Sequence, residues 1–79
     1  MLYLKQRRVQ EARAQFLKAV AGDPTNGMAY LALGDAHLAC GDDDNAFACW
    51  VNATRFDPSG VSGIAARARL SEAKTRLLR

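Results

Sequence analysis

The sequence predicts an all-α fold of antiparallel helix–turn–helix repeats, and three observations support this prediction. The chain matches itself when it is shifted by 34 residues, and an internal period of this length is typical of stacked helical repeats. Apolar residues recur at spacings of three and four, as on one face of a helix, whereas alternating runs of Val, Ile and Thr are not found. The composition is 49% apolar but only 8% aromatic, which favours closely packed helices with small residues at their contacts.

One complete repeat and one incomplete copy account for most of the chain. Residues 1–79 are expected to form a single domain, with an incomplete first repeat at 1–26, a complete repeat at 27–60, and a terminal capping helix, or the start of a third repeat, at 61–79. The residues matched by the shift are Tyr3 with His37, Leu4 with Leu38, Ala12 with Ala46, Ala14 with Ala48, Phe16 with Trp50, Ala19 with Ala53, and Asp23-Pro24 with Asp57-Pro58.

The first copy contains two helical patterns, at residues 1–6 and 9–21. Arg7 stands where the complete repeat has Gly41, so the turn between the patterns lacks its glycine. Two alternatives are open: the chain breaks near Arg7, or residues 1–22 form one continuous helix. Whichever holds, Gly22 is expected to stop this segment, since glycine accepts the left-handed conformation common at helix ends.

The complete repeat predicts helices at residues 28–40 and 44–56, with Gly41 between them. Asp42 is expected to cap the start of the second helix. Gly34 lies in the middle of the first helix, where a glycine costs roughly 1 kcal/mol relative to alanine. The simplest reason for this glycine is the close approach of a neighbouring helix.

The last helical pattern covers residues 64–78. Ser59 or Ser62 is expected to cap it, because serine side chains accept hydrogen bonds from the free N–H groups at helix starts.

Charge is distributed unevenly along a chain of net charge +3. Residues 1–22 have five basic residues and one acidic residue (+4), residues 23–60 have six aspartates and one arginine (−5), and residues 61–79 have five basic residues and one acidic residue (+4). This alternation is expected to favour stacking of units or association of chains in a salt-sensitive way. Nucleic-acid binding through the basic ends is a minor alternative, because no aromatic residues are interleaved with the arginines.

No combination of residues typical of catalysis or metal binding is found, so neither an enzyme nor a cofactor is expected. His37 is the only histidine and is interpreted as a packing residue, since a second ligand and an orienting acid are missing. Cys40 and Cys49 form no CxxC pair and are expected to be free thiols. The run from Asp42 to Asn45 is not an EF-hand, because Phe47 takes the position of the central glycine.

The first residues do not resemble a secretory signal peptide. Met1 to Leu4 is too short an apolar run, and positive charge follows it instead of preceding it. No window approaches the ~20 apolar residues that a membrane span needs. A cytoplasmic, reducing setting is expected, and a targeting segment upstream of Met1 is left open.

Residues 1–60 resemble the tetratricopeptide repeat (TPR) family, whose 34-residue unit is a helix–turn–helix. The residues of the complete repeat that match the motif are Tyr30, Leu33, Gly34, His37, Ala46, Trp50, Ala53 and Pro58. Those of the incomplete copy are Tyr3, Ala12, Phe16, Ala19 and Pro24. The resemblance implies a short right-handed superhelix of stacked repeats, a TPR-like α-solenoid.

The resemblance also implies a function, because the first helix of each TPR lines a concave groove that holds a peptide or a partner helix. A non-enzymatic protein–protein interaction module, or scaffold, is therefore expected. The implied groove residues are Met28, Leu31, Ala32, Asp35, Ala39, Ala65, Ala66, Arg69 and Ala73, with Leu4 and Lys5 at the rim. Ala32 stands where family members that clamp a C-terminal carboxylate have Asn, so a hydrophobic or amphipathic helical ligand is favoured.

A structural role is the alternative. In that interpretation the open ends of the chain, with Leu2 and Leu4 at one side and Leu70, Leu77 and Leu78 at the other, stack on further repeats or on a second copy.

Overall fold

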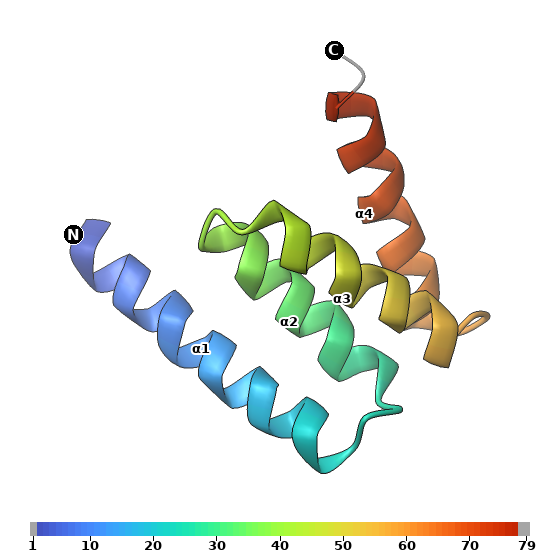
Figure 1. Cartoon of the computed structure of the whole chain (residues 1–79), viewed down its shortest axis with the longest axis horizontal. Coiled ribbons are helices and arrows are strands. Elements are labelled where there is room, and N and C mark those ends of the chain that lie inside the picture. The colour runs from blue at the N-terminus through green and yellow to red at the C-terminus, as the bar shows by residue number, and fades with distance from the viewer. Residues whose placement is uncertain (1, 78–79) are drawn as a thin grey trace.

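The computed structural model describes residues 2–77, and the side chains of residues 7–75 (Figure 1). Four helices are present: α1 (Leu2–Gly22), α2 (Gly27–Ala39), α3 (Asp43–Phe56) and α4 (Val61–Leu77). No strand occurs in these residues, so the predicted all-α class is confirmed. Within the same residues, no helix is long and apolar enough to cross a membrane.

Helices α2 and α3 form an antiparallel hairpin at the centre of the molecule (Figure 1). Gly41 has a φ of +82°, and two backbone hydrogen bonds close the turn around it. The N–H of Gly41 donates to the carbonyl of Leu38 (2.9 Å), and the N–H of Asp42 donates to the carbonyl of His37 (2.8 Å). This pair of bonds is a Schellman motif, which requires the left-handed conformation that glycine adopts without strain.

Asp42 caps α3, as predicted. Its Oδ1 accepts a hydrogen bond from the backbone N–H of Asn45 at 3.2 Å, which satisfies one of the free donors at the helix start. Asp43 and Asp44 occupy the first turn, where the helix dipole favours negative charge.

Helix α1 is continuous, which decides between the two alternatives for residues 1–22. Arginine does not readily adopt the left-handed conformation that Gly41 adopts at the equivalent position, so Arg7 continues the helix. Its Nε lies 3.7 Å from Oε1 of Glu11, one turn further along. Helix α1 ends at Gly22, as predicted. The reason differs from the expected one, because among the described glycines Gly41 alone has a positive φ, and Gly22 does not adopt the left-handed conformation.

Helix α4 begins at Val61 rather than at Ile64, and neither predicted serine caps it. Oδ2 of Asp57 accepts the hydrogen bond from the backbone N–H of Ser62 at 3.2 Å. Asp57 reaches this N–H because α4 folds back against the end of α3, an arrangement that local sequence does not reveal.

The core lies between α2, α3 and α4. Trp50 is 1% exposed and packs against Gly34, where an added Cβ would lie 2.5 Å from Nε1 of Trp50 and 3.2 Å from the carbonyl oxygen of Ala46. The predicted close approach at Gly34 is thus confirmed. The core also contains Ala53, and the rings of Tyr30 and Phe56 stack at 5.6 Å where α2 begins and α3 ends.

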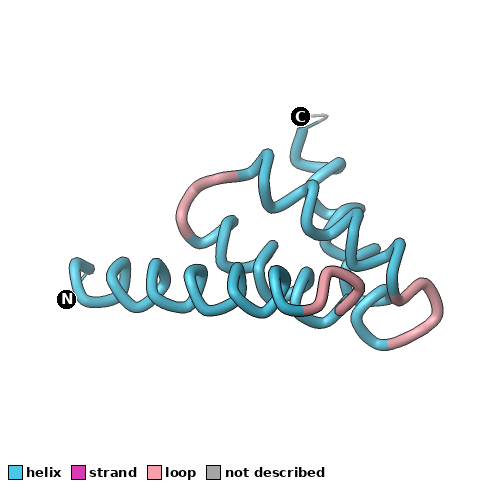
Figure 2. Tube along the Cα trace, turned by 60° about the horizontal axis from the view of Figure 1, so that its bottom comes forward, coloured by secondary structure: helices cyan, strands magenta, loops and turns pink. Residues whose placement is uncertain are grey.

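Each helix packs against the next one along the chain, and α2 also contacts α4. Within the described residues, α1 packs against α2 alone, and its N-terminal part extends beyond the hairpin (Figures 1 and 2). The molecule is flat, with extents of 37 × 37 × 18 Å.

Candidate binding site between α2 and α4

A carboxylate joins three helices where α2 meets α4. Nε of Arg69 lies 2.6 Å from Oδ1 of Asp35, and the same oxygen accepts a hydrogen bond from the indole N–H of Trp50 at 3.1 Å. Arg69 also donates from Nη1 to the carbonyl of Ala65 at 3.2 Å. Because both partners of the ion pair are partly exposed, the pair adds little to the free energy of folding.

The other expected groove residues differ in burial. Met28, at 65% exposure, and the half-buried Leu31, Ala32 and Ala65 lie on the two helices that the ion pair connects. Ala66 and Ala73 are buried, and both belong to the core cluster that contains Trp50.

Ala39 and the rim residues complete the expected set. Ala39 is exposed and, with Cys40, faces α1 across a hollow of ≈210 Å³ lined by Val9 and Gln10. The side chains of Leu4 and Lys5 lie outside the described residues, as do those of Leu2 and Leu77 and all of Leu78.

The Asp35–Arg69 pair was not foreseen, although both residues were expected in the groove. Their numbers differ by the repeat period of 34 residues, so the predicted repeat places them at the same position in consecutive copies. Residues equivalent in this way lie side by side when the units stack. The period itself was therefore the signal that would have predicted the pair.

Histidine and cysteine side chains gather near the α2–α3 turn. His37 is 8% exposed, Cys49 is buried and Cys40 is exposed, and both thiols are free. Burial, and secondarily the negative charge of Asp42, raise the pKa of the Cys49 thiol, which therefore stays neutral and unreactive near pH 7. In the described residues, no three His, Cys, Asp or Glu side chains are placed to hold a metal ion.

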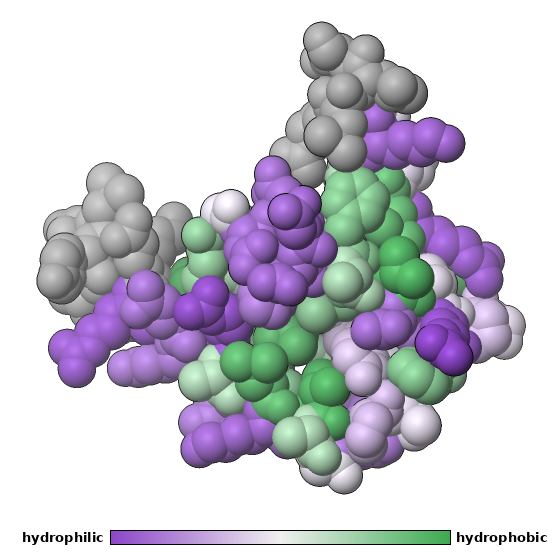
Figure 3. All heavy atoms as spheres, viewed as in Figure 1, coloured by the Kyte–Doolittle hydropathy of each residue, from purple (hydrophilic) through white to green (hydrophobic). Residues whose placement is uncertain are grey.

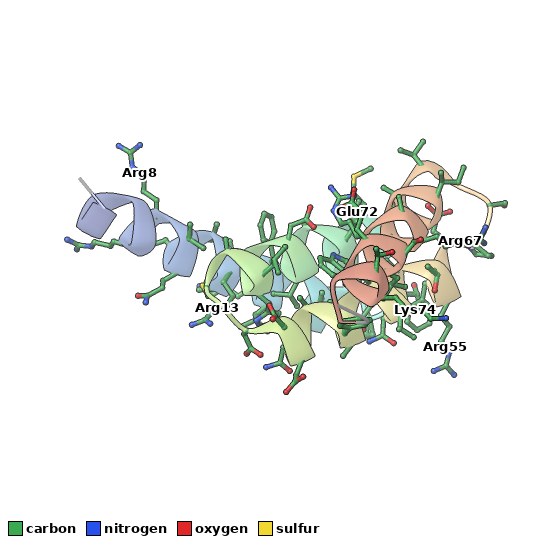
Figure 4. All side chains as sticks on the ribbon, turned by 90° about the horizontal axis from the view of Figure 1, so that it is seen from above. Arg8, Arg13, Arg55, Arg67, Glu72 and Lys74 are labelled. Carbon is green, nitrogen blue, oxygen red and sulfur yellow. The ribbon has the colours of Figure 1, made fainter. Side chains whose placement is uncertain are left out.

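The face seen in Figure 3 carries both apolar and hydrophilic groups. Figure 4 shows that Arg8 and Arg13 of α1 project to different sides, while Arg67 and Lys74 of α4 lie at the other end of the molecule. These basic residues form no common face, which does not favour nucleic-acid binding.

Comparisons of the chain with protein-family models, with curated proteins and with solved structures each found no match. The function is therefore inferred from the chain's own residues and contacts.

Proposed function

We propose that this chain is a non-enzymatic protein-binding module that holds a hydrophobic or amphipathic helical segment of a partner along α2 and α4. The main supporting observation is Met28, a large apolar side chain that is 65% exposed on α2, with Leu31 and Ala32 further along the same helix. Covering apolar area of this kind is favourable by ~25 cal/mol per Å². The resemblance to TPRs points to the same helices.

The proposed binding mode needs a preformed surface. Small residues such as Ala32 and Ala65 let a ligand helix approach the α2 and α4 backbones closely. The Asp35–Arg69 pair connects the two helices across this surface. A preformed site of this kind binds without the entropic cost of ordering it first.

Binding is tested with a fluorescently labelled amphipathic helical peptide of Leu, Ala and Ser, followed by anisotropy. Met28→Lys and Ala32→Glu are expected to weaken binding about tenfold or more, because each places a charge against the apolar face of the peptide. Val51→Lys is the matched control, since Val51 is 50% exposed but lies on α3. Equal loss with Val51→Lys, or no binding by the unmodified chain, would contradict the proposal.

Self-assembly, or stacking on further repeats, is a second candidate, and the repeat itself favours it. In α3, Ala46, Trp50 and Ala53 are 0%, 1% and 0% exposed. In α1 the equivalent Ala12 and Phe16 are only half-buried, and Ala19 is exposed. These three residues of α1 are therefore covered less than their equivalents in α3. In this interpretation, another helix packs on that face of α1.

Sedimentation equilibrium of the full chain over a range of concentrations tests this candidate. Assembly predicts a concentration-dependent dimer or larger species that Ala19→Glu dissociates. Ala14→Glu is the control, because Ala14 is also exposed on α1 but points away from this face. A monomer at all concentrations that still binds peptide would leave only the binding module.

A further inference from the structure

The one histidine of the chain is buried with an unsatisfied ring nitrogen. His37 lies in the last turn of α2 and is 8% exposed. Its Nδ1 is covered and has no hydrogen-bond partner. Buried polar atoms are nearly always paired, so an unpaired one calls for an explanation.

The α2–α3 turn places a carboxylate beside this nitrogen. The N–H of Asp42 donates to the carbonyl of His37 in the Schellman motif, which brings the two residues together. Oδ2 of Asp42 then lies 4.0 Å from Nδ1 of His37. This separation is too long for a hydrogen bond, and Oδ2 accepts one from Nδ2 of Asn45 instead.

The polar and titratable groups next to this pair come from α1 and α3. Arg13 of α1 acts electrostatically on Asp42 and lies near the turn in Figure 4. Hydrogen bonds from the side chain and then the backbone of Asn45 lower the pKa of Asp42, so its carboxylate is ionised throughout pH 5–8. From α3 the neutral thiol of Cys49 is also close to Asp42.

Helix α4 also packs against α2. There, Arg69 of α4 is paired with Asp35 of α2. Imidazole is the side chain whose charge ordinarily changes between pH 5 and 8.

We propose that His37 and Asp42 form a proton-controlled latch at the α2–α3 turn. In the neutral ring with its proton on Nε2, the unpaired Nδ1 has no hydrogen to donate; uptake of a proton from solvent makes both ring nitrogens donors, and Nδ1–H then bonds to Oδ2 of Asp42. Burial of the cation and the charge of Arg13 oppose this step, while the carboxylate and the newly paired Nδ1 favour it. The latch joins the end of α2 to the N-cap of α3 and is independent of any ligand on the α2–α4 surface.

NMR of the full chain tests the latch directly, since a single histidine gives unambiguous ring signals. The backbone amide of Asn45 donates to Asp42 and so reports on its carboxylate. Between about pH 8 and about pH 5, the Asn45 amide signal is expected to shift with the same pH profile as the His37 ring. His37→Phe should abolish this shift, and His37→Tyr serves as a second variant if the first folds poorly. A ring that titrates while the Asn45 amide stays constant would overturn the proposal.

A double-mutant cycle measures the strength of the latch. His37→Phe and Asp42→Asn are combined, because asparagine keeps a good N-cap but removes the charge. The coupling between the two sites in the folding equilibrium constant is expected to be roughly threefold or more larger at about pH 5 than at about pH 8. Equal coupling at the two pH values would contradict the proposed latch.

Discussion

At the scale of single residues, the contact of Gly34 with Trp50 decides how closely α2 and α3 approach. The glycine lacks the Cβ that would meet the indole ring, and the indole N–H reaches Asp35 on the neighbouring turn. Trp50 is thereby both the largest fully buried side chain and a hydrogen-bond donor to the α2–α4 junction. A glycine that weakens the isolated helix thus permits the central packing contact.

Gly34→Ala is expected to destabilise the fold by ~1–3 kcal/mol, because the new methyl group overpacks against the indole ring and the Ala46 backbone. Gly22→Ala is the control: nothing lies within 4 Å of a Cβ there and its φ is not positive, so it should be neutral or slightly stabilising. Urea unfolding followed by circular dichroism gives both values. Similar effects of the two variants on stability would show that the contact with Trp50 does not explain Gly34.

At the scale of helices, the same sequence pattern is covered to different extents in α1 and α3. Helix α3 is packed by α2 on one side and α4 on the other, whereas α1 packs on α2 alone within the described residues. Identical alanines at equivalent positions therefore have different burial. Sequence equivalence predicts a helix face, but only the neighbouring elements decide whether that face is buried.

Ala46→Leu and Ala12→Leu form a matched pair that tests this difference. Ala46 is 0% exposed, so the larger side chain should overpack the α2–α3 contact and cost ~1–3 kcal/mol. Ala12 is only half-buried, so the same change should cost much less. Thermal denaturation of both variants measures the difference, and equal losses would mean that α1 is covered in solution.

The cap of α3 makes stability depend on acid pH. The hydrogen bonds from Asn45 lower the pKa of Asp42 below its ordinary value of 3.8, so the folded chain binds this proton less readily than the unfolded chain. The contribution of Asp42 is therefore complete above about pH 4 and is lost as the pH falls through its lowered pKa. Asp42→Asn should remove this part of the acid sensitivity while it keeps a cap. Urea midpoints of the unmodified chain and of Asp42→Asn, measured from about pH 7 to about pH 2, show whether the stabilities of the two proteins depend differently on pH.

At the scale of the whole molecule, the polar link from Trp50 through Asp35 to Arg69 connects α2, α3 and α4. The apolar core beneath it consists largely of alanine, which packs closely but contributes little area per residue. We therefore expect the link to set the position of α4 relative to α2, and with it the shape of the proposed binding surface.

Asp35→Asn is expected to loosen α4 without unfolding the α2–α3 hairpin. Asparagine can still accept from Trp50 but has no charge for Arg69, and loss of a partly exposed pair costs ~0.2–1 kcal/mol. Hydrogen exchange should therefore accelerate in α4 more than in α2 and α3. Glu11→Gln, which breaks the highly exposed pair with Arg7, is the control. It should change hydrogen exchange neither in α4 nor in the α2–α3 hairpin.

The sequence alone determined the elements whose signals are local or periodic. The helices at 27–56, the turn at Gly41, the cap at Asp42 and the contact at Gly34 were all predictable, because each depends on residues within one repeat. The implied groove residues were predictable as positions on α2 and α4, but not in their exposure.

Only the tertiary structure decided what depends on contacts between separate segments. The burial of Ala66 and Ala73, the capping of α4 by Asp57, and the pairing of Asp35 with Arg69 all result from how α4 folds back on α2 and α3. The approach of Asp42 to the buried Nδ1 of His37 depends likewise on how the α2–α3 turn closes. Sequence patterns specify which face of a helix is apolar, but packing in three dimensions determines which neighbour covers it and which polar atoms meet.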